Sequence, residues 1–188
     1  MDSTGLVAPI MARVNSDTES AAVAQLAPAH DEDVLVIGFG PGVGLRALAQ
    51  VVTAGHIAGI DPSQVMHDHA RRRNRAACER GLIELRHGRA DDLPWPDESF
   101  DGAIAVNNMQ FWEPFGASVA EVARVLRPAG RFVSFTHEWA IPRGSGMTTD
   151  DWTGRACAVF RDRGLAETRT WRTTARSGTS IAFTARRS

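Results

Sequence analysis

A glycine-rich segment is the part of this sequence whose residue types and spacing most clearly suggest chemistry. It directly follows four apolar residues, 34–37, and its order is Gly38-Phe39-Gly40-Pro41-Gly42-Val43-Gly44. Glycines let the backbone turn sharply and let a ligand approach with no Cβ in the way. A helix beginning after the segment would offer free N–H groups to a carboxylate or phosphate. The segment therefore predicts a ligand-binding loop, although a loop of this kind does not by itself identify the ligand.

Polar residues follow three later apolar runs. Asp61 stands 19 residues beyond Gly42, where a carboxylate can accept hydrogen bonds from both hydroxyls of a ribose. Residues 89–92 (Arg-Ala-Asp-Asp) follow the next run, and Asn107-Asn108 follows the one after it. If these runs are parallel strands, their carboxyl ends meet at the edge where open α/β sheets bind ligands. We therefore expect all of these groups at one site.

His137 and Glu138 are the residues best placed to act as a base if the reaction must remove a proton, because they follow the fifth apolar run. A histidine at a strand end also makes structural hydrogen bonds, and this alternative stays open for His137. Trp112 and Trp139 follow the fourth and fifth runs. They would either line an apolar pocket for a flat molecule or pack in the core. The sequence thus leaves the catalytic residue unidentified, with His137 as the candidate.

No metal site is expected from the histidines and cysteines. His67 and His69 are two positions apart, which separates them by about 200° on a helix. Cys78 and Cys157 are isolated and form no Cys-x-x-Cys pattern. Two isolated thiols are typical of a reduced compartment, and we predict a cytoplasmic protein.

Short apolar runs alternate with longer segments of helical periodicity over most of the chain. The strands predicted from the runs are Val34–Ile37, Ile57–Ile60, Leu82–Leu85, Gly102–Val106 and Arg131–Thr136. The predicted helices are Asn15–Leu26, Leu45–Val52, Ser63–Arg80, Val119–Leu126 and Thr149–Arg163. This β-α-β-α order predicts a parallel sheet covered by helices on both faces.

The end of the chain departs from this order. Two extended stretches, Glu167–Ala175 and Thr179–Ala185, have no helix between them and predict a hairpin, so one late strand must run antiparallel to the rest. The fold class expected is α/β: a Rossmann-like doubly wound sheet, mostly parallel with an antiparallel C-terminal hairpin, in a three-layer sandwich. The 188 residues should form one domain, with a leader and helix over 1–30, a core over 31–136, and a helix and hairpin over 137–188.

Lysine and tyrosine are both absent, and all 21 basic residues are arginine. The absence of lysine excludes Schiff-base enzymes and the P-loop, and the absence of both excludes a catalytic Tyr–Lys pair. No apolar run approaches the roughly 18–20 residues of a membrane span. Asp2, with no basic segment before an apolar stretch, argues against a signal peptide. Residues 143–188 carry nine Arg and four acids, which suits either an anionic partner or a solvated surface.

A nicotinamide dinucleotide is one alternative ligand for the glycine loop. Its G-x-G-x-x-G fingerprint fails when it is counted from Gly38, because Val43 takes the third glycine position. Counted from Gly42 the pattern is tolerable, but it then begins four residues past the strand, too late for the turn. An NAD(P)-dependent oxidoreductase therefore remains an alternative, but this fingerprint fits the sequence poorly.

Taken together, these segments resemble class I S-adenosylmethionine-dependent methyltransferases, most of all the ubiquinone and menaquinone biosynthesis group (methyltransferase type 11). The resemblance covers roughly residues 30–136. Residues 34–44 are similar to motif I of that family, and Gly59-Ile60-Asp61-Pro62-Ser63 is similar to its ribose-binding segment. Residues 88–101 and 121–131 are similar to the stretches before its fourth and fifth strands. The predicted hairpin agrees with the antiparallel seventh strand of the family.

This resemblance implies S-adenosylmethionine as cofactor, with S-adenosylhomocysteine as product. It places the methionine part of the cofactor at Gly38, Phe39, Gly40 and Gly42, and the ribose at Asp61. It places the adenine between Pro62 and the segment Arg89-Ala90-Asp91, and Asn107 near the sulfonium. From their position in the sequence alone, Met11 and Asn15 of the leader helix are expected to close over the cofactor.

Two positions depart from the family pattern. Val36 stands where family members usually have an acid two residues before the first glycine, and Arg89 stands in place of an aspartate. An arginine cannot accept the adenine amino proton, so Asp91 would have to do so. These departures keep open a catalytically weak or non-catalytic binding module with the same fold.

The activity expected from the resemblance is methyl transfer to a small-molecule acceptor. The segment after the fourth predicted strand, residues 107–112, lacks the Pro-Pro-aromatic motif of methyltransferases that act on base amino groups. The arginine run over residues 71–75 reads as a solvated helix face. We therefore expect neither a nucleic-acid partner nor a membrane span, and a homodimer is left open.

Overall fold

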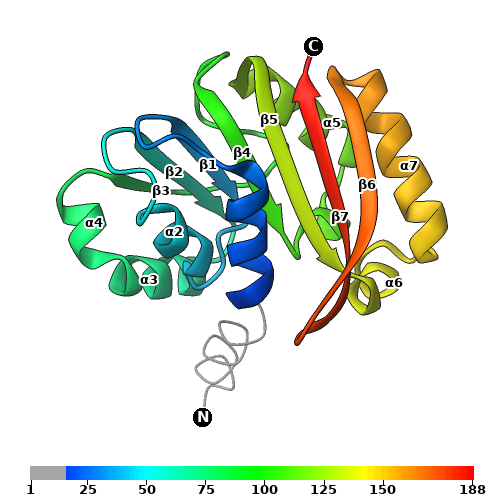
Figure 1. The fold of residues 1–188 in the computed structure, drawn as a ribbon, viewed down its shortest axis with the longest axis horizontal. Coiled ribbons are helices and arrows are strands. Elements are labelled where there is room, and N and C mark those ends of the chain that lie inside the picture. The colour runs from blue at the N-terminus through cyan, green and yellow to red at the C-terminus, as the bar shows by residue number, and fades with distance from the viewer. Residues whose placement is uncertain (1–15) are drawn as a thin grey trace.

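Five parallel strands and a C-terminal hairpin share one seven-stranded sheet in the computed structural model, which describes residues 16–188 (Figure 1). The strands are β1 (Asp33–Ile37), β2 (His56–Asp61), β3 (Ile83–His87), β4 (Phe100–Val106), β5 (Leu126–His137), β6 (Leu165–Ala175) and β7 (Gly178–Arg187). Their order is β3-β2-β1-β4-β5-β7-β6, and β7 runs antiparallel to both of its neighbours. The expected mostly parallel, doubly wound sheet with an antiparallel hairpin is confirmed.

Helices cover both faces of this sheet and complete three layers (Figure 1). They are α2 (Val43–Leu48), α3 (Gln64–Arg73), α4 (Arg75–Glu79), α5 (Phe115–Val125), α6 (Ile141–Ser145) and α7 (Thr149–Asp162), preceded by a helix over residues 16–26. Val34 and Val36 of β1 share an apolar cluster with residues of the N-terminal helix, α2 and α3. Leu35 and Ile37 belong to a second cluster with residues of α5 and α7. A strand buried on both faces reads as an unbroken apolar run, as the sequence predicts.

The N-terminal helix, residues 16–26, packs over the middle of the sheet (Figure 1). Its Leu26 lies against Gly102 of β4, where a Cβ would approach Leu26 Cδ1 to 2.9 Å. The helix predicted over Asn15–Leu26 is therefore confirmed as far as it is described. Met11 and Asn15, the two residues expected to cover a cofactor, lie outside the described residues.

The single helix predicted over Ser63–Arg80 is wrong, because the chain breaks at Asn74 into α3 and α4. Asn74 is buried, and its Nδ2 donates to the carbonyl oxygens of Gly42 and Ala70, each at 3.0 Å. A side chain that bonds to nearby carbonyls competes with a continuous helix. The break therefore ties the start of α2 to the end of α3.

Other boundaries also differ from the prediction. Helix α2 ends at Leu48 rather than Val52, because the N–H groups of Gln50 and Val51 donate three residues back and form turns. Helix α5 begins at Phe115 and gives way to β5 at Leu126, which pairs with Phe100 of β4. Helix α6 and the short 3₁₀ turns η1 (Met109–Phe111) and η2 (Glu138–Ala140) have no counterpart in the prediction.

Strands β6 and β7 close the hairpin through Ala175 and Gly178, which pair directly across a two-residue turn. Aromatic side chains join the hairpin to the rest of the core: the ring of Phe183 lies 5.7 Å from that of Phe160 of α7, which lies 5.6 Å from Phe132 of β5.

Over residues 16–188, no helix combines the length and apolarity needed to cross a membrane.

Candidate functional site

A cavity of about 310 Å³ opens at the carboxyl ends of β1, β2 and β4, and we refer to it as the main cavity. Eight of the ten residues predicted to bind a cofactor line it: Gly38, Gly40, Asp61, Pro62, Arg89, Ala90, Asp91 and Asn107. They meet there because parallel strands bring their carboxyl ends, and the loops that follow, to one edge of the sheet.

Asp61, at the end of β2, joins two backbone segments of the main cavity. Its Oδ2 accepts the N–H of Gly40 at 2.8 Å, and its Oδ1 accepts the N–H of Ser63 at 2.9 Å. Burial raises the pKa of Asp61, and the two backbone hydrogen bonds and the nearby His67 and His87 oppose this rise. Each carboxylate oxygen has two lone pairs, so an acceptor position remains on each for a bound ligand.

Gly38 and Gly40 have left-handed backbone conformations, with φ of 65° and 50°. A Cβ on Gly38 would lie 2.6 Å from Nδ2 of Asn108, whereas a Cβ on Gly40 would meet no atom within 4 Å. Gly38 thus allows a close approach between β1 and β4. Gly40 leaves open space in the cavity wall.

Phe39 and Gly42 do not line the main cavity. Phe39 is 1% exposed and packs in the core against Gly59. A Cβ on Gly42 would lie 2.8 Å from Cα of Ala70, so this glycine lets α2 pack closely against α3. The Phe39 ring and the missing side chain of Gly42 therefore both serve packing beneath the loop.

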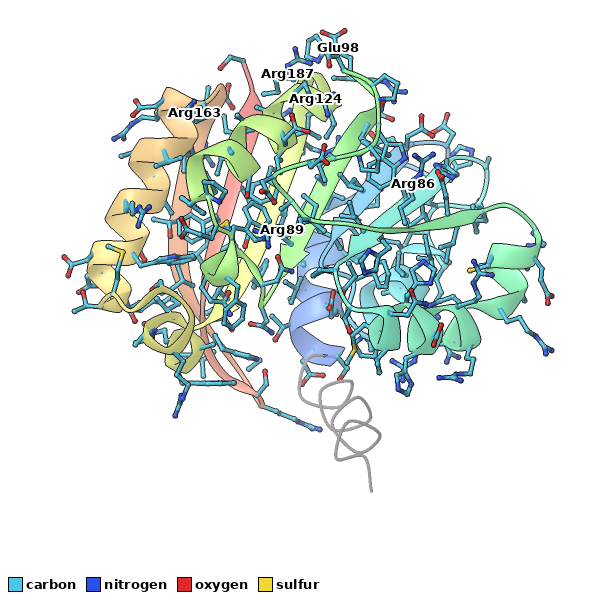
Figure 2. The ribbon with its side chains drawn as sticks, turned by 180° about the vertical axis from the view of Figure 1, so that it is seen from behind. Arg86, Arg89, Glu98, Arg124, Arg163 and Arg187 are labelled. Atoms are coloured by element: carbon cyan, nitrogen blue, oxygen red, sulfur yellow. The ribbon has the colours of Figure 1, made fainter. Side chains whose placement is uncertain are left out.

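Arg89 and Asp91 lie in the loop between β3 and β4 and form an ion pair, with Nε 2.9 Å from Oδ1. Arg89 is labelled in Figure 2. Arg89 also donates a hydrogen bond to the carbonyl oxygen of Glu113. The hydrogen bond from Arg89 is the main cause that lowers the pKa of Asp91. Arg89 thus bridges the β3–β4 loop and the segment before α5, and its partner Asp91 is ionised.

The two asparagines after β4 hold neighbouring strands together. Asn107 Oδ1 accepts the backbone N–H of His137 at 2.9 Å, which links β4 to β5. Asn108 Nδ2 donates to the carbonyl oxygen of Ile37 at 2.8 Å, which links β4 to β1, and its Oδ1 accepts Nε1–H of Trp112 at 3.0 Å. Trp112 is thereby fixed in the wall of the main cavity.

His137, the candidate base, is 1% exposed and is not among the residues that line the main cavity. Its Nδ1 lies 2.9 Å from Oγ of Ser180, and burial lowers its pKa. Glu138 is ion-paired with Arg172 at 2.6 Å. Trp139 stacks on the ring of His137 and is 54% exposed. The structure thus places His137 in a structural hydrogen bond at the end of β5.

A second cavity of about 300 Å³, the side cavity, adjoins the main cavity. Both cavities are lined by Phe111, Trp112 and Glu113. The side cavity lies between η1 and α6, and its other lining residues include Met109, Phe115, Gly144, Trp152 and Arg155. Four of its ten lining residues are aromatic, and the rest include polar residues such as Gln110, Ser145 and Arg155. The sequence did not predict α6, so this cavity could not be predicted from it.

Glu19 is a lining residue that the sequence analysis missed. It stands on the N-terminal helix three, four and seven residues before Ala22, Val23 and Leu26, which are all buried. This spacing is the buried stripe of an amphipathic helix. An acid on such a stripe was the signal that could have identified it.

No group of three or more His, Cys, Asp or Glu side chains in residues 16–188 is arranged to hold a metal ion.

The chain matches the protein-family model described as a methyltransferase domain, over residues 35–134. It is 37% identical over 103 residues to a demethylmenaquinone methyltransferase of Symbiobacterium thermophilum, covering 54% of this chain and 41% of that protein. It is 36% identical over 100 residues to a fatty-acid O-methyltransferase of Mycolicibacterium smegmatis, covering 53% of this chain and 35% of that protein. The chain thus matches well under half the length of these two relatives.

Solved structures show a similar fold at low sequence identity. A putative methyltransferase of Haloferax volcanii, in complex with the activator Trm112, superposes with a TM-score of 0.75 at 20% identity, covering 94% of this chain and 91% of that one. Geranyl diphosphate C-methyltransferase of Streptomyces coelicolor superposes with a TM-score of 0.76 at 14% identity, covering 94% and 80%. The likeness in fold therefore covers more of the chain than residues 35–134, which the family model matches.

Proposed function

Since this chain belongs to the methyltransferase domain family, we propose that it binds S-adenosylmethionine in the main cavity and transfers a methyl group to a small molecule. The observation that carries the proposal is Asp61. Its carboxylate holds the glycine loop through Gly40 and lines the cavity at the edge of the sheet where ligands bind.

The residues present fit this cofactor. Asp61 offers acceptor positions for the hydroxyls of a ribose, and Gly40 leaves the cavity wall without a side chain. Ile60, Pro62 and Ala90 supply an apolar part of the wall, as the flat face of an adenine requires. Asp91 also lines the cavity, and its Oδ1 is the oxygen that pairs with Arg89.

The cofactor supplies an electrophilic methyl group on a sulfonium. The task of the protein is then to bind and orient the acceptor and to exclude water. In well-oriented reactions, this positioning lowers the activation free energy by about 7–11 kcal/mol. Asn108 fixes Trp112 in the wall that both cavities share, and Phe111 lies beside it. These residues hold the boundary between cofactor and acceptor in a defined shape.

We propose that the acceptor is apolar and enters through the side cavity. The aromatic residues Phe111, Trp112, Phe115 and Trp152 line that cavity and favour a flat or hydrocarbon-rich molecule. The names of the two relatives above, which specify demethylmenaquinone and a fatty acid, denote acceptors of this kind. Glu113 lines both cavities and replaces His137 as the candidate to accept a proton from the acceptor.

A reduced, cytoplasmic setting remains part of this proposal. Cys78 and Cys157 form no disulfide, and both are partly buried. Burial raises the pKa of each thiol, which keeps it protonated and unreactive.

Calorimetry with S-adenosylhomocysteine tests the cofactor assignment. We expect one site in the full chain. Asp61→Ala should weaken binding about tenfold or more, because lost polar contacts cost on the order of 1–3 kcal/mol. Asp92→Ala is the matched control, since Asp92 is exposed and does not line the main cavity. Methyl transfer would then be followed with radiolabelled S-adenosylmethionine and a panel of apolar acceptors.

A non-catalytic binding module is the second candidate, and the observation that favours it is Val36. It is 3% exposed within an apolar cluster, so no carboxylate comes from this position of β1, just before the glycine loop. If millimolar S-adenosylhomocysteine gives neither heat nor a thermal shift, the methyltransferase proposal is wrong. A response to NAD or NADP instead would indicate the oxidoreductase alternative.

A further inference from the structure

Glu19 is a buried carboxylate in the wall of the main cavity. It lies on the helix over residues 16–26 and is 6% exposed. Its Oε2 is buried and accepts no hydrogen bond from any residue of the described range. A Cβ on Gly44, at the start of α2, would collide with this oxygen, so the carboxylate is held tightly against the backbone that follows the glycine loop.

An unpartnered carboxylate in this position is costly, because burial without hydrogen-bond donors removes the hydration of the charge. The other ionisable side chains that line the main cavity within residues 16–188 are Asp61, Arg89, Asp91 and Glu113. Arg89, the cation in this set, is paired with Asp91. Burial therefore raises the pKa of Glu19 to about 8. A ligand that brings both a positive charge and N–H donors would relieve this cost.

We propose that Glu19 is the residue that binds the α-ammonium group of the cofactor. This inference rests on the proposed function, since it takes the cofactor to be S-adenosylmethionine. That cofactor carries two cations, the sulfonium and the ammonium. Of these two cations, only the ammonium has N–H groups to donate to the carboxylate of Glu19, so the chemistry of an unpartnered carboxylate selects it.

The location of Glu19 also agrees with the absence of an acid at residue 36. Val36 shares one apolar cluster with Ala22, Val23 and Leu45, so it lies on the sheet face covered by the helix that carries Glu19. A carboxylate supplied from that helix reaches the glycine loop from the same face. Strand β1 can then be apolar at residue 36 while the cavity keeps a carboxylate.

The proposal is tested by comparing two ligands: S-adenosylhomocysteine and its analogue in which hydrogen replaces the α-amino group. The two ligands differ only at the α-amino group, which is the group assigned to Glu19. Neither has a sulfonium, so that cation does not affect the comparison. We expect the unsubstituted full chain to prefer S-adenosylhomocysteine about tenfold or more in calorimetry. Glu19→Gln should remove most of this preference by weakening S-adenosylhomocysteine, and should leave the affinity for the analogue nearly unchanged. Asp17→Asn, an exposed acid on the same helix, is the matched control and should keep the preference.

A second measurement uses the unsubstituted chain alone. At pH 7 the free chain holds Glu19 protonated, and contact with an ammonium ionises it, so binding should release close to one proton. Calorimetry of S-adenosylhomocysteine in phosphate and in Tris buffer measures this release, which the analogue should not cause. A role confined to packing would produce no such difference between the two ligands.

The outcomes separate the two proposals. If S-adenosylhomocysteine binds but Glu19→Gln keeps the preference, or if both ligands release equal numbers of protons, the role of Glu19 is wrong and the proposed function stands. If the unsubstituted chain binds neither ligand, both proposals are wrong.

Discussion

Glu19 makes the stability of the free protein depend on pH in a direction opposite to that of most carboxylates. Its pKa is about 8 in the folded chain, compared with 4.5 for an unperturbed glutamate. Below pH 4.5 the carboxyl is protonated in both states and has no effect. As the pH rises from 4.5 to 8, the unfolded chain loses the proton while the folded chain keeps it, so unfolding becomes more favourable. Above pH 8 the full cost is about 5 kcal/mol, at roughly 1.4 kcal/mol per pKa unit.

Glu19→Gln should therefore stabilise the ligand-free protein at high pH. We expect denaturant unfolding to show a gain of several kcal/mol over the unsubstituted chain at pH 8.5 and little difference at pH 4.5. Asp17→Asn should show no such pH dependence, because Asp17 is exposed. A difference of the same size at both pH values would mean that folding does not raise the pKa of Glu19.

At the residue scale, the sequence predicts those lining residues of the main cavity whose positions are determined by the ends of strands. Asp61 and Asn107 could be predicted because each directly follows an apolar run, and such ends meet at one edge of the sheet. Phe39 could not be separated from the glycines beside it, since which way its ring points depends on the packing around Gly59. The position of Glu19 on the buried stripe of its helix marks it as unusual, but the sequence does not show which cavity its side chain enters.

The same distinction holds at the scale of elements. The strands were predicted well because burial on both faces leaves an unbroken apolar run, as over residues 34–37. The break at Asn74 was not, because it depends on the carbonyl oxygen of Gly42, which is remote in sequence. Helix α6 contains both Pro142 and Gly144, a composition typical of a loop. The sequence therefore predicts neither this helix nor the side cavity that it lines.

Arg124 of α5 holds the loop between β3 and β4, which carries Arg89 and Asp91. Its guanidinium donates to the carbonyl oxygens of Leu93 and Trp95, at 2.9 and 2.8 Å, and also pairs with Glu121 and Asp97. Figure 2 shows Arg124 toward one end of the sheet and Arg89 nearer the middle, so the loop runs between them. An arginine has five donors in a fixed plane, which a lysine cannot reproduce.

Arg124→Lys should accordingly destabilise the protein by about 1–3 kcal/mol, because two carbonyl oxygens lose their donors. The loop that forms one wall of the main cavity should loosen, and S-adenosylhomocysteine should bind more weakly. Denaturant unfolding and calorimetry measure the two effects. Arg163→Lys is the control, since Arg163 is exposed on the turn after α7 and should show neither effect. Unchanged stability in Arg124→Lys would show that the ion pairs alone hold the loop.

At the scale of the whole molecule, the site draws on both faces of the sheet. Glu19 enters the main cavity from the helix on one face, whereas Trp112 and Ser118 enter it from the side of α5. The family model matches residues 35–134, which contain the glycine loop, Asp61 and Trp112 but neither Glu19 nor the hairpin. The family model therefore matches one part of the cavity wall, and residues outside its range complete that wall.

The hairpin and α7 should be required for that core to fold. Phe132 of β5 is fully buried, and the rings that cover it belong to Trp112 and to Phe160 of α7, which in turn contacts Phe183 of β7. Without β7, the twelve-residue strand β5 would become an exposed sheet edge, which favours aggregation. We expect a chain ending at residue 137 to lack cooperative unfolding and dispersed amide signals in NMR spectra.

Phe183→Ala gives a graded version of the same test in the full chain. Removing a fully buried phenylalanine costs about 3–5 kcal/mol, and the loss should appear in denaturant unfolding. Because Phe183 lines neither the main nor the side cavity, the affinity for S-adenosylhomocysteine should be preserved wherever the variant is folded. A chain ending at residue 137 that unfolds cooperatively and binds the ligand as the full chain does would show instead that residues before 138 complete the core by themselves.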